Sequence, residues 1–300
     1  MTERVWRPGR PVDLRATLGA LVRGPYDPVQ GFDGNVFWTA ARTPQGPGTL
    51  ALDGTPDAIT ARAWGSGADW LLDRVPALLG AGDDWSGLDL SRDPGLRAVA
   101  HRYRGLRLCR TERVMDALVP AILEQRVTHA EARRAWVGLV RRYGEPAPGP
   151  RAGLFVPPAP EALLAVPTWT WHRLGVDLAR SRAVRAVATV ATRLRECVSL
   201  PGDAARARLR AVPGVGEWTA AETTVRALGD PDALSVGDFH LAHLVVHYFT
   251  GRARGTDEEM AALLAPWAGQ RARIVSLIAH SGVRPPRFGP RFAANDIRAV

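Results

Sequence analysis

Two short motifs carry the residues of this chain that are best suited to chemistry. The first, residues 209–220, reads LRAVPGVGEWTA and places a Pro-Gly-x-Gly turn between two helical patterns. Glycines such as Gly214 and Gly216 let a backbone approach a ligand closely, and the N–H groups at a helix start attract anions. This turn can therefore hold a DNA phosphate without reading the base sequence. The alternative is an ordinary connection between two helices that ends on a glycine.

The second motif, residues 234–241, reads LSVGDFHL and contains one carboxylate, Asp238. An aspartate at the start of a helix is often an N-cap, which accepts backbone N–H groups. Beside a phosphate-binding turn, the same carboxylate can stabilise positive charge that develops during a reaction. We predict that Asp238 is catalytic. His240 lies two residues further along the expected helix and should point elsewhere, so we assign it to packing.

Residues 1–108 contain short apolar runs separated by Gly, Pro and Asp. The runs at 36–38, 49–52 and 58–61 predict strands, and Pro44, Gly46 and Gly48 predict the hairpin loop between the first two. Apolar residues at helical spacing predict a helix over 68–79. We expect a small antiparallel sheet with one or two packed helices.

Helix formers dominate from residue 111 onward. The run 111–142 predicts a long helix that is broken only by Pro120 and ends near Gly144. A proline-rich connection follows at 146–160. Further helical patterns occupy 161–166, 177–197, 203–211, 218–228, 238–250, 257–265 and 270–280. Both chemical motifs thus lie at junctions between expected helices.

The composition narrows the class of protein. The formal net charge is +9, as in proteins that meet polyanions. All 39 basic side chains are arginine, so no lysine amine can form a Schiff base. Cys109 and Cys197 are too few for an iron–sulfur cluster or a cysteine-rich zinc site. We find no apolar run of membrane-spanning length and no signal peptide, and we expect a reducing cytoplasm.

The motif at 209–220, followed by Val-Gly-Asp at 236–238, resembles the helix-hairpin-helix DNA glycosylases, and among them the 3-methyladenine DNA glycosylase II (alkylpurine glycosylase) type. The resemblance extends over most of the chain. Further segments are similar. Residues 64–70 and 76–80 resemble the accessory sheet domain, 122–127 resemble the start of the helix that enters DNA, and 266–267 with the arginines around 271–273 resemble the closing helix.

The resemblance implies an α+β fold. A small N-terminal antiparallel sheet domain with helices would precede an all-α helix-hairpin-helix region of two subdomains, with a cleft between them. We place the N-terminal domain at 1–108 and the helical domain with the hairpin at 109–230. The C-terminal helical subdomain, which completes the cleft, is expected at 231–300.

The resemblance also implies hydrolysis of the N-glycosidic bond of alkylated or otherwise damaged purines in duplex DNA, as in base excision repair. Asp238 would stabilise an oxocarbenium-like sugar and orient or deprotonate the attacking water. No cofactor and no catalytic metal are expected. The partner is double-stranded DNA whose damaged base flips out of the stack, and we expect a monomer in the cytoplasm, associated with the nucleoid through DNA. The alternative is a catalytically silent helix-hairpin-helix protein that binds DNA or senses lesions.

The same resemblance places Trp218 and Glu222 in the base pocket, on one face of a helix. Trp218 matches the position of the Schiff-base lysine in related bifunctional glycosylases, so a monofunctional enzyme is expected. An indole can stack on a cationic purine, or it can simply pack in the core. Glu222 stands where the resembled type has an aromatic residue, and 276–280 lack a tryptophan of its pocket. The Glu222 carboxylate either contacts a base or is a solvated surface group.

Contacts with DNA are implied for residues of two segments, which are Gly214, Val215, Gly216, Thr219, Gln125 and Arg126. The pair Gln125-Arg126 would fill the gap that a flipped base leaves in the duplex. The resembled type has an aliphatic wedge at the second position, so Arg126 either fills the gap by hydrogen bonding and stacking or lies outside the DNA. A monovalent cation bound by the carbonyls of Val212 and Val215 is also implied.

Two other groups of residues have open assignments. The aromatic cluster of Trp169, Trp171 and His172 belongs either to the core or to a surface that stacks on bases. The tail arginines at 284, 287 and 291 either contact phosphates or are solvated or paired with carboxylates.

Overall fold

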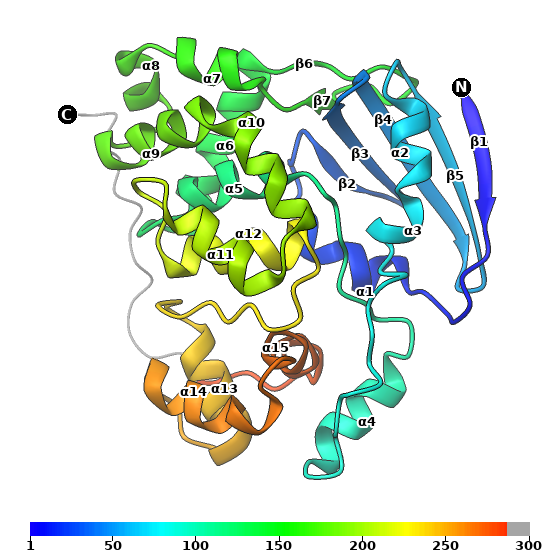
Figure 1. The fold of residues 1–300 in the computed structure, drawn as a ribbon, viewed down its shortest axis with the longest axis vertical. Helices are drawn as coiled ribbons and strands as arrows, with labels where there is room; N and C mark the ends of the chain where they lie inside the picture. Colours follow the sequence, from blue (N-terminus) through cyan, green and yellow to red (C-terminus); the bar gives the residue numbers. More distant parts are fainter. Residues whose placement is uncertain (287–300) are drawn as a thin grey trace.

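The computed structural model describes residues 1–286 and contains an antiparallel sheet of five strands (Figure 1). The strands are β1 (Thr2–Trp6), β2 (Gln30–Asp33), β3 (Val36–Thr43), β4 (Gly46–Thr55) and β5 (Ala58–Trp64). Their order across the sheet is β1-β5-β4-β3-β2. Strands β3, β4 and β5 confirm the three predicted runs. The sequence does not reveal the edge strands β1 and β2, because neither buries a side chain and neither shows apolar alternation.

The turn between β3 and β4 is tighter than the sequence predicts. Only Pro44 and Gln45 lie outside the two strands, so the prediction that Gly46 and Gly48 belong to the loop is wrong. These glycines lie in β4 because a neighbouring segment packs directly on the strand. A Cβ on Gly48 would lie 2.7 Å from Cδ1 of Leu71.

Short helical segments pack against the sheet. They are α1 (Leu14–Leu18), the 3₁₀ helix η1 (Gly19–Leu21), α2 (Ala68–Asp73) and α3 (Val75–Leu78). Their apolar side chains share one hydrophobic core with β3, β4 and β5. The helix predicted over 68–79 is present as two helices that separate at Arg74. Pro76 has no N–H group with which to continue the first of them.

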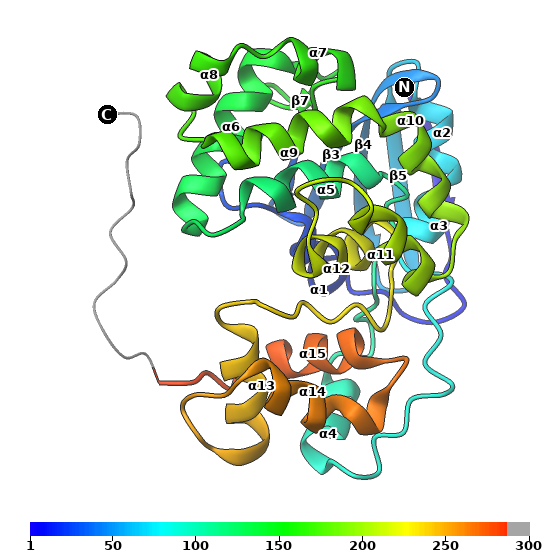
Figure 2. The same cartoon turned by 60° about the vertical axis from the view of Figure 1, so that its left-hand side comes forward.

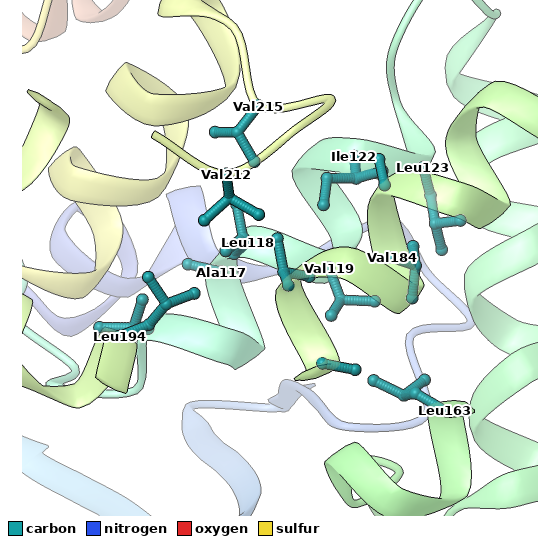
Figure 3. Close-up of a cluster of buried hydrophobic side chains, with 14 of the residues drawn as sticks. Ala117, Leu118, Val119, Ile122, Leu123, Leu163, Val184, Leu194, Val212 and Val215 are labelled. Carbon is teal, nitrogen blue, oxygen red and sulfur yellow. The ribbon is translucent and has the colours of Figure 1, made fainter. Parts of the chain in front are cut away.

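Helix α5 (Val114–Leu123) lies at the centre of the largest hydrophobic core of the described chain. Figure 3 shows Leu118 and Ile122 of this helix among Val184, Val212 and Val215. All five side chains are at most 6% exposed. The turn at 211–216 is therefore anchored to α5 by two buried valines.

The elements that follow α5 are mostly helical (Figure 2). They are α6 (His129–Tyr143), β6 (Glu145–Pro146), β7 (Phe155–Val156), α7 (Pro160–Ala165), α8 (Thr168–Arg173), α9 (Leu178–Thr189), α10 (Ala191–Leu194), the 3₁₀ helix η2 (Arg195–Ser199), α11 (Gly202–Arg210) and α12 (Glu217–Ala227). The helical patterns predicted between 161 and 228 are confirmed, although the pattern at 177–197 is divided at Val190 and α8 is an additional helix.

The prediction that Pro120 breaks the helical run 111–142 is wrong. Helix α5 continues through the buried Pro120, and the break lies at residues 124–128 instead. There Arg126 has the left-handed φ of +54°, and Thr128 begins α6 with a capping box to Glu131. Residues 122–127 therefore form the end of one helix and a connecting loop, and not the start of a helix as the resemblance implied.

The C-terminal helices form a third group with its own hydrophobic core (Figure 2). The group consists of α13 (Leu241–Thr250), α14 (Asp257–Leu264), the 3₁₀ helix η3 (Ala265–Trp267), α15 (Arg271–His280) and, from earlier in the chain, α4 (Pro94–Arg102). Leu96 and Leu106 thus pack with the C-terminal helices, although the sequence places them within the domain 1–108. The domain boundaries themselves stay a prediction.

The described residues also bear on the chemistry of thiols, metals and membranes. Cys109 and Cys197 are both free and buried, and burial raises the pKa of Cys109 to about 11. Within residues 1–286, no group of His, Cys, Asp and Glu side chains has an arrangement that could hold a metal ion. The helices of this same part are all too short or too polar to cross a membrane.

A buried ion pair ties α15 to the segment that precedes α4. Arg273 donates to Oδ1 of Asp83, and each side chain is only 2% exposed. Oδ2 of Asp83 accepts the N–H of Leu108 at 3.0 Å and the indole N–H of Trp85 at 2.8 Å. One carboxylate therefore joins three separate segments.

We expect Asp83→Ala to lower the free energy of unfolding by about 3–5 kcal/mol, because the buried Arg273 would be left without a counter-charge. Urea unfolding measures this loss. The control is Glu196→Ala, because Glu196 forms a solvent-exposed pair with Arg208. That variant should lose less than about 1 kcal/mol. Equal losses in the two variants would contradict the assignment.

Candidate active site

The predicted catalytic residue Asp238 lies against the indole of Trp218. The Nε1–H group of Trp218 donates to Oδ2 of Asp238 over 3.0 Å, and the two residues are 20 positions apart. Trp218 is in the first turn of α12, and Asp238 is in the loop before α13. Both side chains are half-buried. The structure therefore brings the acid and the indole into direct contact.

The backbone of the next turn holds the second carboxylate oxygen of Asp238. Oδ1 accepts the N–H groups of His240 at 2.8 Å and of Leu241 at 2.9 Å. Helix α13 begins at Leu241, three residues later than the sequence suggests, so Asp238 caps the helix from the preceding loop. Gly237, with φ +86°, turns the chain immediately before it. Three donors and the positive end of α13 thus hold the carboxylate.

Glu222 makes a second contact between α12 and the same loop, one turn after Trp218. Its Oε1 accepts the hydroxyl of Ser235 at 2.6 Å, and its Oε2 pairs with Arg226 at 2.6 Å. Burial acts to raise the pKa of Glu222, but Arg226 and Ser235 outweigh it and leave the pKa below its ordinary value. The side chain is 16% exposed, so the expectation of a solvated surface group is wrong. A contact of Glu222 with a base stays a prediction.

The turn between α11 and α12 is closed from the inside. The N–H of Val215 donates to the carbonyl of Val212 over 3.1 Å, and both side chains are buried. Gly214 has φ +85°, and a Cβ there would lie 2.5 Å from the Cβ of Ala183 on α9. This position therefore requires glycine for its backbone conformation and for its packing.

The outer side of the turn leads to the N-terminus of α12. Gly216 is the N-cap, and no side chain from the described part of the protein caps this helix. The space around Gly216 is open. The first N–H groups of α12 are thus available to an anion such as a phosphate.

Gln125 joins the loop after α5 to this turn. Its Nε2 donates to the carbonyl of Gly214 at 2.9 Å and to the hydroxyl of Thr219 at 2.8 Å. Thr219 is only 2% exposed and its hydroxyl accepts from Gln125, so its predicted contact with DNA stays a prediction that this burial does not favour. Arg126 is exposed, and its guanidinium has no hydrogen bond or ion pair to another residue of 1–286. The two segments that were predicted to contact DNA therefore lie side by side.

The fold is similar to solved DNA glycosylase structures over nearly its whole length. A 3-methyladenine DNA glycosylase from Archaeoglobus fulgidus matches with a TM-score of 0.77 and 18% identity, covering 93% of this chain and 98% of that one. The structure of MBOgg1 in complex with a low-affinity DNA ligand matches with a TM-score of 0.73 and 17% sequence identity, covering 94% of this chain and 96% of that one. The apo form of an 8-oxoguanine glycosylase/lyase from Clostridium acetobutylicum matches with a TM-score of 0.72 and 11% sequence identity, covering 94% of this chain and 97% of that one. The chain has the fold of the helix-hairpin-helix DNA glycosylases.

Sequence comparison gives relatives of the same kind. A protein of Mycobacterium tuberculosis named probable bifunctional transcriptional activator/DNA repair enzyme AlkA is 37% identical over 160 residues, which are 51% of this chain and 31% of the relative. DNA-3-methyladenine glycosylase 2 of Escherichia coli is 29% identical over 166 residues, 54% of this chain and 57% of the relative. The alignments thus span only part of each relative. No protein-family model matches the chain.

In this glycosylase fold, the hairpin carbonyls are the implied ligands of a monovalent cation. The carbonyl of Val212 accepts one N–H group, which leaves it one lone pair. Backbone carbonyl oxygens are common ligands of hard cations. The cation at Val212 and Val215 stays a prediction.

The aromatic residues on α8 do not form one cluster. Trp171 is 2% exposed and lies in the core, whereas Trp169 is 65% exposed and His172 is also exposed. Residues two apart on a helix point in different directions, which separates Trp169 from Trp171. The prediction of a common cluster is therefore wrong.

The other predicted residues, His240 and the tail arginines, make different contacts. His240 is exposed, and its ring packs edge-on against Phe239, with 4.9 Å between centroids. Arg284 donates to the carbonyls of Ala279 and Val283. The arginines at 287 and 291 lie outside the described residues.

Two cavities of the glycosylase fold are separate from Asp238. One of about 170 Å³ is lined by residues of 22–32 and 151–154, and another of about 20 Å³ is lined by residues that include Arg23, Arg113 and Arg226. Neither is lined by Asp238 or Trp218. The site at Asp238 is therefore distinct from both cavities.

We expect Gly214→Ala to destabilise the fold by about 1–3 kcal/mol, because the new methyl group would meet Ala183 in a left-handed backbone conformation. Gly216→Ala is the matched control, since it adds the same group in open space at φ −89°. It should cost no more than about 1 kcal/mol. Urea unfolding compares the two, and similar losses would contradict the proposed packing of the turn.

Proposed function

We propose that this protein is a monofunctional DNA glycosylase that hydrolyses the N-glycosidic bond of alkylated or otherwise damaged purines in duplex DNA. It leaves an abasic site. The observation that carries the proposal is the 3.0 Å hydrogen bond from Trp218 to Asp238 beside the hairpin. A module that only binds DNA needs the hairpin, but it does not need an oriented carboxylate next to an indole.

The surroundings of the Asp238 carboxylate support a role in glycosidic cleavage. Such a reaction passes through a sugar with oxocarbenium character, which a nearby negative charge stabilises. Oδ1 accepts two N–H groups, and Oδ2 accepts one. Since each carboxylate oxygen can accept two, Oδ2 keeps one acceptor direction for the sugar or for the attacking water.

The residue types of the site support hydrolysis without strand cleavage. Among the similar folds are a 3-methyladenine DNA glycosylase and an 8-oxoguanine glycosylase/lyase, so the fold alone does not distinguish the two reactions. A lyase reaction through a lysine Schiff base is excluded because the chain contains no lysine. Trp218 can instead stack its indole on a cationic alkylated base.

The surface next to Asp238 suits a duplex with one base turned out. The hairpin offers N–H groups to a phosphate, and Gln125 fixes the neighbouring loop to the hairpin. Arg126 is exposed on that loop and has no hydrogen bond or ion pair within residues 1–286, so its guanidinium can fill the gap in the base stack. The names of the sequence relatives, a DNA repair enzyme and DNA-3-methyladenine glycosylase 2, support alkylated purines as the substrate class.

We expect Asp238→Asn to reduce base release by about 100-fold or more, because the transition state loses its counter-charge. The amide oxygen can still cap α13, whereas the amide NH2 group cannot accept the Trp218 N–H, so the variant should fold with lower stability and keep its affinity for damaged duplex DNA. Chromatography of bases released from N-methylated duplex DNA measures the rate, and a gel-shift titration measures the affinity.

The matched control for that experiment is Asp203→Asn. It makes the same charge change on an exposed carboxylate in the first turn of α11. Base release by this variant should equal that of the wild type. Normal release by Asp238→Asn would remove Asp238 from the mechanism. If the wild-type protein binds damaged DNA but releases no base, the catalytically silent alternative is correct.

We also expect strands that have lost a base to stay intact until they are heated or treated with alkali, since no lysine can form the imine that precedes elimination. Denaturing gels before and after alkali measure the breaks. Sodium borohydride should trap no covalent protein–DNA adduct. Prompt nicking by the pure protein, or a trapped adduct, would show lyase activity.

A further inference from the structure

The loop that carries Asp238 is attached to α12 at two points. Trp218 donates to Asp238 over 3.0 Å, and Ser235 donates to Glu222 over 2.6 Å. Trp218 and Glu222 are four residues apart and therefore share one face of α12. Between the two contacts, the N–H of Asp238 donates to the carbonyl of Ser235 over 3.3 Å. A displacement of Ser235 would therefore displace Asp238 through this backbone hydrogen bond.

The contact at Glu222 is itself firmly held. Arg226 pairs with Glu222 Oε2 at 2.6 Å and also donates to the Glu222 carbonyl at 3.0 Å. Its Nε donates to the carbonyl of Ala20 in η1, at 3.1 Å. The side chains of Arg226 and Glu222 are only 21% and 16% exposed. An ion pair with this burial and these additional partners is fixed in one geometry, unlike a pair on the surface.

A second ion pair places the DNA-facing loop in the same charged cluster. Arg23 pairs with Glu124 at 2.5 Å, and the two side chains are 8% and 15% exposed. Glu124 precedes Gln125, which holds the hairpin. The charge of Glu124 acts to raise the pKa of Arg226, and the charge of Glu222 acts to raise the pKa of Arg23. The cluster therefore lies between the segment of η1 and Arg23, the loop after α5 and the loop of Asp238.

We propose that Glu222 is a positioning residue for Asp238, acting through Ser235, and that Arg226 and the carbonyl of Ala20 hold Glu222 in place. This inference rests on the proposed function, because it assumes that Asp238 is the catalytic acid. It differs from a direct contact of Glu222 with the base. Both carboxylate oxygens of Glu222 already have protein partners, and the group that they hold leads to Asp238.

The effect of such a residue is on orientation. A carboxylate that is displaced by a fraction of an ångström still binds water and cations, but it no longer meets the sugar correctly. Loss of the Ser235–Glu222 contact should therefore slow the chemical step and leave DNA affinity nearly unchanged.

The test compares Ser235→Ala, Glu222→Gln and the double variant with the wild-type protein. The matched control is Thr223→Val, which removes a buried hydroxyl from the same helix. That hydroxyl donates to the Thr219 carbonyl at 2.7 Å and not to the loop of Asp238. The first readout is hydrogen–deuterium exchange of the backbone amides in residues 235–241, which requires no enzymatic activity.

We expect both single variants to accelerate this local exchange by about tenfold or more, the factor for one hydrogen bond to a charged acceptor. The double variant should exchange no faster than the more affected single variant, because Ser235→Ala removes the contact and Glu222→Gln weakens the same contact by removing the charge of its acceptor. Thr223→Val should leave exchange at 235–241 unchanged even where it lowers the melting temperature as much. Unchanged exchange in Ser235→Ala, or additive effects in the double variant, would overturn the proposal.

The second readout is single-turnover base release from N-methylated duplex DNA. The rate should fall by about tenfold in Ser235→Ala, with the affinity for DNA close to that of wild type and of Thr223→Val. A loss of affinity with an unchanged rate would overturn a positioning role. If the wild-type protein releases no base, the proposed function fails, and the exchange experiment still decides whether Glu222 fixes the loop.

Discussion

The hydrogen bond between the indole of Trp218 and the carboxylate of Asp238 is the constraint on which the site depends. A half-buried carboxylate is costly unless donors surround it. Here one donor comes from the first turn of α12, and two come from the first turn of α13. The site therefore exists only if two helices from different parts of the fold begin at the right places.

The architecture around the hairpin fulfils that requirement. Val212 and Val215 bury the turn against α5, and Gly214 lets it approach α9, so the start of α12 is fixed by the largest core of the described chain. The third group of helices, joined to the rest by Asp83 and Arg273, fixes α13. The 3₁₀ helix η1, which packs against the small sheet, contributes through the Ala20 carbonyl, which accepts a hydrogen bond from Arg226. Each of these parts of the fold thus helps to position the loop of Asp238, directly or through α12 and α13.

The sequence predicts the helical part and the two chemical motifs well, because a Pro-Gly-x-Gly turn and a helix-capping aspartate are local patterns. It predicts the central strands for the same reason. It does not predict contacts between distant segments, such as Gln125 with Gly214 or Glu222 with Ser235, since no local spacing encodes them. The sequence predicts the break at Pro120 and not at 124–128, because a proline can be read from a sequence, whereas the left-handed backbone of Arg126 cannot. The sequence does not predict the edge strands β1 and β2, because they bury no side chain and so show no apolar alternation.

The left-handed backbone conformation of Arg126 lowers the stability of the loop after α5. A residue with a Cβ at φ +54° is less stable than glycine would be at the same place. Folding alone therefore favours the smallest residue at the tip of this loop. Within residues 1–286, the long and charged side chain that stands there makes no hydrogen bond or ion pair that would offset this cost. The residue at the tip is therefore poorly explained by the stability of residues 1–286 alone.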